Sequence, residues 1–242
     1  AVALRDQVGM IDYSDFSVRI FPRRFDSDRR QALLNTYYSL LFSSFSKSFW
    51  VLDEDRPFIY HKDGDSKSDD DWRTIDLSKH IGSGSGLGIG VASTEDDLLA
   101  ITTDDGSEGL VYFPQQDRIL STGPMRTVGT TNEPMIMPYI DAYTQHVIFA
   151  DVQGNVALFD LKKGDEKPQR FTVDFSPRFI RTGWLESTWI LAGDKGIMFQ
   201  SFDDPSDRRI DRFRPEIMSV WVTGDSKTAL YTLDEGAPAI YR

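Results

Sequence analysis

The chain contains no cysteine, and this absence removes several classes of chemistry. Disulfide frameworks, thiolate metal sites, iron–sulfur clusters and thiol nucleophiles all need cysteine side chains. The sequence also lacks an apolar run of the roughly 18 residues that a membrane-spanning helix requires. We therefore predict no insertion into a membrane.

Basic charge is scarce, because 27 Lys and Arg residues face 38 Asp and Glu residues and leave a net charge of −11. A surface this acidic repels phosphate backbones, so we predict no nucleic-acid partner. The densest basic run, residues 19–30, is interrupted by Asp26 and Asp28 and is typical of a solvated segment. The charge balance favours a protein partner that carries Lys or Arg.

Motifs for metal binding and catalysis are absent as well. His61, His80 and His146 have no histidine three to five positions away, which argues against a zinc site built from local ligands. The acidic tract 61–71 lacks the spacing of a calcium loop. The glycines of 82–90 match no phosphate-binding motif and suit a strand where backbones crowd. We predict no metal, no cofactor, no catalytic residue and no enzymatic activity.

Repeated hairpins are the main positive signal. Residues 49–60 and 230–241 share an apolar run, a Leu-Asp-Glu turn, a proline and a second run that ends in Ile-Tyr. Three further hairpins, over 98–113, 146–159 and 189–199, turn at Asp and Gly. Successive hairpins begin about 40–49 residues apart, which is the period of β-propeller blades.

Each hairpin follows another apolar segment, and the first four precede a short segment with an early arginine. Four strands of this kind make one blade. We predict an all-β fold: a five-bladed β-propeller of four-stranded antiparallel blades, closed by an N-terminal strand that covers the last open edge. The chain would be a single domain, 1–242, with blades near 36–77, 87–121, 134–174, 178–212, and 216–242 plus 16–22.

One hairpin carries a family resemblance. Residues 151–164 resemble the Gly-x-Val-x-Leu-Trp-Asp-Leu-x-x-Gly stretch of a WD40 repeat, with Phe159 in the Trp position. The resemblance implies a divergent WD40-type propeller. Ile240-Tyr241-Arg242 also resembles the end of tectonin-type lectin repeats.

The predicted function is a non-catalytic platform for protein–protein interaction, a WD40-like scaffold or adaptor whose channel mouth or loops hold a partner. The predicted contact residues, all expected near one channel mouth, are Asp141, Glu186, Asp225 and Trp184. Two alternatives stay open. The tryptophans would form the sugar platform of a carbohydrate-binding propeller, or carboxylates on four blades, Glu95, Asp141, Glu186 and Asp225, would serve a five-bladed glycoside hydrolase.

Overall fold

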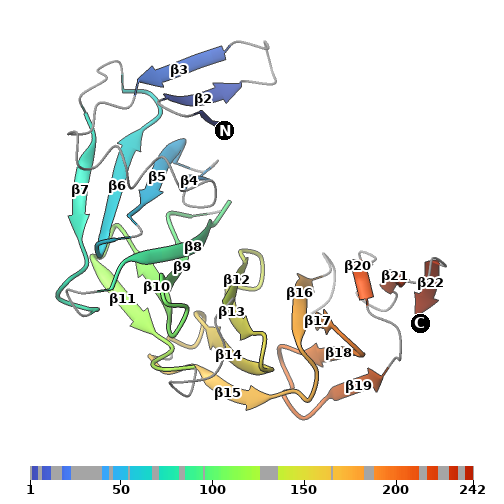
Figure 1. Cartoon of the computed structure of the whole chain (residues 1–242). Coiled ribbons are helices and arrows are strands. Elements are labelled where there is room, and N and C mark those ends of the chain that lie inside the picture. The colour runs from blue at the N-terminus through green and yellow to red at the C-terminus, as the bar shows by residue number, and fades with distance from the viewer. Residues whose placement is uncertain are drawn as a thin grey trace. The chain divides into compact units, whose positions relative to one another are not determined.

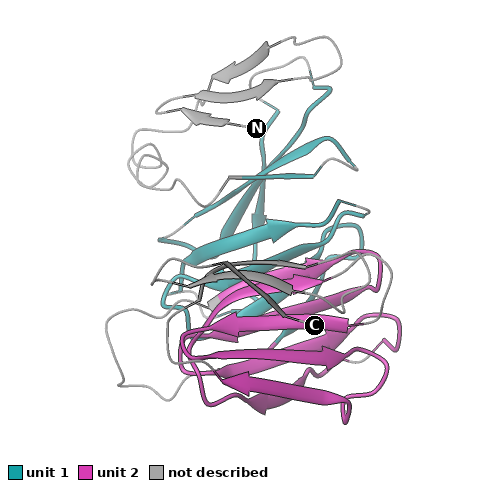
Figure 2. Ribbon diagram, turned by 90° about the vertical axis from the view of Figure 1, so that its right-hand side faces the viewer, with its two compact units in different colours: residues 1–121 teal, residues 122–242 magenta. Residues whose placement is uncertain are grey.

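The structure is a computed structural model of the chain, and the elements assigned in it are β-strands (Figure 1). It describes residues 2–4, 7–11, 18–22, 40–43, 46–53, 55–66, 71–81, 85–94, 96–125, 136–164, 166–182, 188–212, 217–222, 229–233 and 238–241. Within these ranges, no helix is long and apolar enough to cross a membrane. The chain divides into two compact units, residues 1–121 and 122–242, which Figure 2 shows in different colours.

Unit 1 contains three antiparallel sheets, and the strands of each lie side by side in chain order. The first is β1 (Val2–Leu4), β2 (Gln7–Ile11) and β3 (Val18–Pro22). The second is β4 (Leu40–Ser43), β5 (Ser48–Leu52), β6 (Phe58–Asp63) and β7 (Arg73–Asp76). The third is β8 (Leu87–Ala92), β9 (Leu99–Thr103), β10 (Gly109–Phe113) and β11 (Arg118–Ser121).

Unit 2 repeats this arrangement. Its first sheet is β12 (Ile136–Asp141), β13 (His146–Asp151), β14 (Asn155–Asp160) and β15 (Gln169–Thr172). Its second is β16 (Pro177–Thr182), β17 (Thr188–Gly193), β18 (Gly196–Ser201) and β19 (Arg208–Arg212). Its third is β20 (Ile217–Val222), β21 (Ala229–Leu233) and β22 (Pro238–Tyr241).

The all-β class and the four-stranded antiparallel sheets are confirmed. Closure by an N-terminal strand is not found among the described strands: residues 18–22 pair with β2, and β22 pairs with β21. Residues 2–4 and 7–11, which the sequence analysis did not assign, are strands that form this local hairpin. A hairpin with a short connection costs less chain entropy than a pairing across the length of the chain, which explains the local pairing.

Within each unit, neighbouring sheets contact one another along their first strands. In unit 1, β8 lies against β4 and β5, and in unit 2, β16 lies against β12 and β20. The glycines of β8 follow from this proximity. A Cβ on Gly90 would lie 2.9 Å from Leu41 Cδ1 and 3.0 Å from Leu52 Cδ1. The expectation that these glycines serve a strand where backbones crowd is confirmed at this position.

Burial falls from the middle of the four-stranded sheets to their last strands. All residues of β5, β9 and β13 are buried, whereas β7 and β15 are mostly exposed. The last strands use arginine to hold their position: Arg118 lies over the Phe113 ring at 4.3 Å, and Arg208 lies over the Phe171 ring at 3.7 Å. Guanidinium groups on aromatic faces combine apolar packing with a cation–π attraction.

Acidic residues shape the hairpin turns, as the sequence predicts. Asp151 Oδ1 accepts hydrogen bonds from the backbone N–H groups of Gln153 and Asn155 at 2.9 and 2.8 Å. At the β9–β10 turn, Asp105 has this role rather than Asp104, because its Oδ1 accepts from the Ser107 N–H at 3.0 Å. Short carboxylate side chains favour such turns because they satisfy the free N–H groups locally.

Candidate functional site

A polar cleft of about 550 Å³ opens in unit 1 between the sheet β4–β7 and the sheet β8–β11. Strand ends and turns line it, so its walls carry polar side chains rather than the apolar residues of the strand middles. One wall is formed by Ser46, Ser48, Trp50, His61, Asp63 and residues 73–76, and the other by Asp97, Tyr112, Pro114, Gln115 and Asp117.

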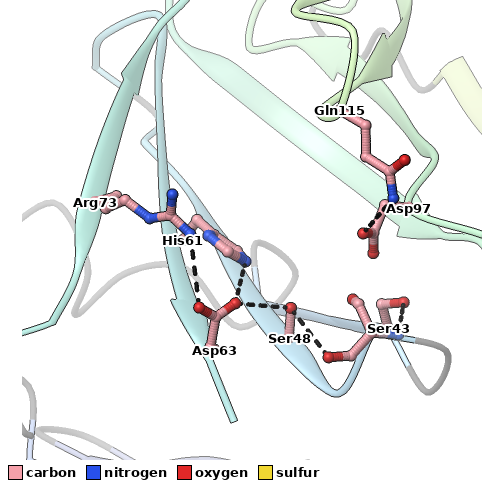
Figure 3. A network of polar contacts seen from close by, with 8 residues as sticks. Ser43, Ser48, His61, Asp63, Arg73, Asp97 and Gln115 are labelled. Carbon is pink, nitrogen blue, oxygen red and sulfur yellow. Dashed lines mark hydrogen bonds and ion pairs between the residues drawn. The ribbon is translucent and has the colours of Figure 1, made fainter. Parts of the chain in front are cut away.

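The carboxylate of Asp63 is the centre of the first wall. It ends β6 directly opposite Ser48, the first residue of β5. Its Oδ1 accepts a hydrogen bond from Ser48 Oγ at 3.5 Å and lies 3.4 Å from His61 Nε2. Arg73 Nη2 approaches Oδ2 at 3.6 Å, so three side chains converge on one carboxylate (Figure 3).

Ser48, His61 and Asp63 are the residue types of a catalytic triad, but they are connected differently. In a triad, the serine hydroxyl is hydrogen-bonded to one histidine nitrogen and the carboxylate to the other. Here both Ser48 Oγ and His61 Nε2 approach the same oxygen of Asp63. The Ser48 hydroxyl is bonded to a carboxylate, which is a much weaker base than imidazole, so this geometry suits structure and binding rather than nucleophilic attack.

The second wall offers a carboxylate that is only half used. Asp97 Oδ2 accepts a hydrogen bond from Gln115 Nε2 at 3.3 Å (Figure 3). Its other oxygen, Oδ1, is buried and has no hydrogen-bond partner among the described residues. A buried polar atom without a partner costs roughly 1–3 kcal/mol, so Asp97 Oδ1 is an acceptor that a ligand donor would satisfy.

Trp50 and His61 lie next to each other in the first wall. Their rings stack with centroids 3.9 Å apart, and Trp50 is 2% exposed. The Trp50 Nε1–H is buried and, within the described part of the chain, also lacks a hydrogen-bond partner. Two buried polar atoms of the lining residues, one donor and one acceptor, therefore lack partners among the described residues.

The cleft is negatively charged. Burial lowers the pKa of His61 despite the opposing effects of Asp63 and Asp97, so the ring is neutral at pH 7. Hydrogen bonds from Ser78 lower the pKa of Asp76 and keep it ionised. Arg73 is the one full positive charge among the lining residues, against four aspartates: Asp63, Asp76, Asp97 and Asp117.

These carboxylates are spread along the cleft rather than gathered at a point. No group of three or more His, Cys, Asp or Glu side chains that would hold a metal ion is found where the structure describes side chains. A metal ion needs several oxygen or nitrogen ligands at about 2–2.6 Å from one centre. The distribution suits a larger cationic group instead.

The residues that the sequence analysis selected lie elsewhere. Asp141 ends β12, is 7% exposed, and its Oδ1 accepts hydrogen bonds from the N–H groups of Tyr143 and Thr144 at 3.1 and 3.2 Å. Trp184, Glu186 and Asp225 lie outside the described residues, as does Glu95. The structure therefore does not test whether the four predicted contact residues gather at one mouth.

Two residues of unit 2 bear on the alternatives raised by the sequence. His146 is 5% exposed and stacks on Phe202 at 4.1 Å. Trp189 is fully buried. Trp50 and Trp189 are therefore unavailable as a sugar platform, since a ligand cannot reach a covered ring.

The cleft residues Ser48, His61, Asp63, Asp97 and Gln115 were not identified from the sequence as a site. They come from separate strand ends, and each is ordinary where it stands. The sequence does contain one signal for this site. Ser48 begins β5 and Asp63 ends β6, and two polar residues in these positions face each other across an antiparallel hairpin.

No protein-family model matches the chain, and no curated protein matches it in sequence. Among solved structures, it resembles the crystal structure of Chaetomium thermophilum Sqt1 bound to the N-terminus of the ribosomal protein L10, with a TM-score of 0.64 over 98% of the chain at 13% identity. Its fold is that of a WD40-type β-propeller. This confirms the fold that the WD40 resemblance implied. The chain corresponds to 64% of the length of the Sqt1 chain.

Proposed function

We propose that this WD40-type chain is a non-catalytic platform that binds a protein partner. The observation that carries the proposal is the polar cleft of unit 1, which presents buried and unpaired hydrogen-bonding atoms without a serine–histidine relay. Sheets with fully buried central strands form a rigid scaffold, and their turns form the recognition surface. Sqt1, which shares the fold, was solved bound to the N-terminus of a ribosomal protein, which supports a protein partner for this chain.

A second part of the proposal is the contact surface predicted from the sequence, made of Asp141, Glu186, Asp225 and Trp184. These acidic and aromatic side chains suit a partner with Lys or Arg, because complementary charge speeds association and fixes orientation. In this proposal, Asp141 combines its role in the β12–β13 turn with a position at the edge of the contact surface.

Cross-linking capture followed by measurement of affinity tests the function. The chain would be photo-cross-linked to its partner, and the partner would then be purified and titrated against the intact chain. The variant Asp141→Asn, Trp184→Ala, Glu186→Gln, Asp225→Asn is expected to bind at least tenfold more weakly. A chain that captures no protein contradicts the function, and wild-type affinity in the variant contradicts the predicted contact surface.

We also propose that the sheets form a five-bladed ring closed between β3 and β22. Both strands lie at the edge of their sheets, so each has one backbone edge without a partner in the described strands. Because the chain has no cysteine, Ile20→Cys and Ile240→Cys introduce a unique pair of thiols. A short bifunctional thiol reagent is expected to link them within one chain, and monomers that stay unlinked contradict closure.

A further inference from the structure

We infer that the cleft between the sheets β4–β7 and β8–β11 binds the side chain of a Lys or Arg residue, with Asp97 as its anion. This deepens the proposed function, on which it rests, because it assigns a chemical class and a position to one contact of the protein partner. The ligand chemistry is a cation with N–H donors on a narrow apolar stem.

The first argument is the unpaired acceptor. Asp97 is fixed by the Gln115 amide on Oδ2 at 3.3 Å, and Oδ1 stays buried without a partner in the described part of the molecule. A buried carboxylate oxygen gains most from a charged donor, because charge-assisted hydrogen bonds are roughly twice as strong as neutral ones. An ammonium or guanidinium group supplies such a donor and neutralises the charge.

The second argument concerns the other carboxylates that line the cleft. Asp63 is approached by Ser48, His61 and Arg73 at 3.4–3.6 Å. Asp97 is the carboxylate of the cleft that has a buried oxygen without a partner in the described residues. Asp76 and Asp117 also line the cleft and add negative potential there, which attracts a cation before it reaches the anion.

The third argument is the neutral histidine of the first wall. A protonated histidine beside Asp97 would compete with a cationic ligand, but burial holds the pKa of His61 below its ordinary value. Trp50 stacks on His61 and is 2% exposed, so its ring is covered and does not contact the ligand.

The test uses the intact chain and three capped tripeptides: acetyl-Gly-Arg-Gly-amide, acetyl-Gly-Lys-Gly-amide and acetyl-Gly-citrulline-Gly-amide. Citrulline has nearly the shape of arginine but carries no charge. The readout is the indole N–H signal of Trp50 in two-dimensional NMR, assigned by its loss in Trp50→Phe. Saturable movement of this signal with the Arg or Lys peptide is expected, and none with the citrulline peptide.

Asp97→Asn keeps the shape of the side chain and removes its charge, and it is expected to weaken binding about tenfold or more. The matched control Glu166→Gln with Asp203→Asn removes exposed charges in unit 2 and is expected to bind as the wild type does. Thermal unfolding of each variant would show whether it is folded. If Asp97→Asn is unfolded, Asp117→Asn replaces it, with a smaller expected loss.

Three results would overturn the inference: no movement with either cationic peptide, equal movement with the citrulline peptide, or equal affinity in a folded Asp97→Asn variant. The outcomes also separate this inference from the proposed function. If a captured partner binds Asp97→Asn as tightly as the wild type, the platform stands and the cleft assignment fails. If the peptides bind but no protein is captured, the cleft stands and the platform fails.

Discussion

Ser48 in unit 1 and His146 in unit 2 occupy the same position in their sheets. Each begins the second strand and lies opposite the aspartate that ends the third, Asp63 and Asp160 respectively. In unit 2 the imidazole fills the space beside its sheet, and Phe202 of the next sheet stacks on it at 4.1 Å. In unit 1 the serine is too small to fill that space.

The sheets next to these two positions, β16–β19 and β8–β11, also differ in the size of the side chain at one strand end. The residue directly after β18 is Phe202, whereas the residue directly after β10 is Pro114, which lines the cleft. Side-chain size at two strand ends thus determines whether the space between sheets becomes a packed core or an open polar cleft. Two similar backbone frames can therefore differ in binding capacity without any change in strand order.

The two regions are expected to differ most in the free energy of unfolding that each loses when its buried tryptophan is replaced by alanine. Trp189→Ala is expected to lower the free energy of unfolding by about 3–5 kcal/mol, because the cavity left in the core of unit 2 has no access to water. Trp50→Ala is expected to cost less, since Trp50 borders a cleft that water can enter. Urea unfolding followed by circular dichroism measures both, and equal losses would show that the two regions are packed alike.

His146→Ser copies the side chain of unit 1 into unit 2. The expected cost is about 2–3 kcal/mol, because the change removes the ring that stacks on Phe202 and lies 3.7 Å from Asp160. Ser48→Ala, the matched control in unit 1, removes weak hydrogen bonds of 3.4 and 3.5 Å and is expected to cost less than about 1 kcal/mol. Similar urea midpoints for the two variants would contradict the comparison.

Stability is also expected to fall in mild acid through both histidines. Burial lowers the pKa of His61 and of His146 below the ordinary value of 6.5. The unfolded chain therefore binds these protons more readily than the folded chain, and the free energy of unfolding falls as the pH drops through 6.5. Urea unfolding between pH 7.5 and pH 5.5 measures the slope.

Single histidine variants show how much of this change of unfolding free energy with pH comes from each region. His61→Gln and His146→Gln are each expected to flatten the slope. Asp104 acts in the opposite direction, since burial and the nearby Asp105 raise its pKa above 3.8. A slope that survives both histidine variants would have another origin.

The smallest expected effect belongs to the exposed ion pairs. Arg73→Gln in unit 1 and Lys163→Gln in unit 2 are each expected to cost less than about 1 kcal/mol, because their side chains are 72% and 64% exposed. Thermal unfolding in low and high salt measures this, and 0.5 M NaCl is expected to reduce either effect. A larger loss at Arg73 would show that it orders the cleft wall.

Much of the fold could be predicted from the sequence because its signals are local. Turn acids such as Asp151 lie between two apolar runs, and the early arginines mark the last strand of each four-stranded sheet. The strands at residues 2–4 and 7–11 were not predicted, because the repeated hairpins that carry the fold prediction begin at residue 49. Which of the adjacent residues Asp104 and Asp105 binds the turn N–H cannot be told from the sequence.

The cleft could not be predicted in the same way, because it depends on which strand ends meet. Asp97 precedes β9 and Gln115 follows β10, and each resembles an ordinary turn residue in sequence. Their relation to Ser48 and Asp63 exists only once two sheets pack together. Burial of Asp97 Oδ1 without a partner is likewise a property of the packed structure.

The missing side chain at Gly90 has a consequence for the packing of the sheets that border the cleft. A methyl group there would lie 2.9 and 3.0 Å from the Cδ1 atoms of Leu41 and Leu52 in the adjacent sheet, which is inside van der Waals contact. In Gly90→Ala the ends of these two leucine side chains must shift. A position without any polar group can thus alter how the sheets β4–β7 and β8–β11 fit together.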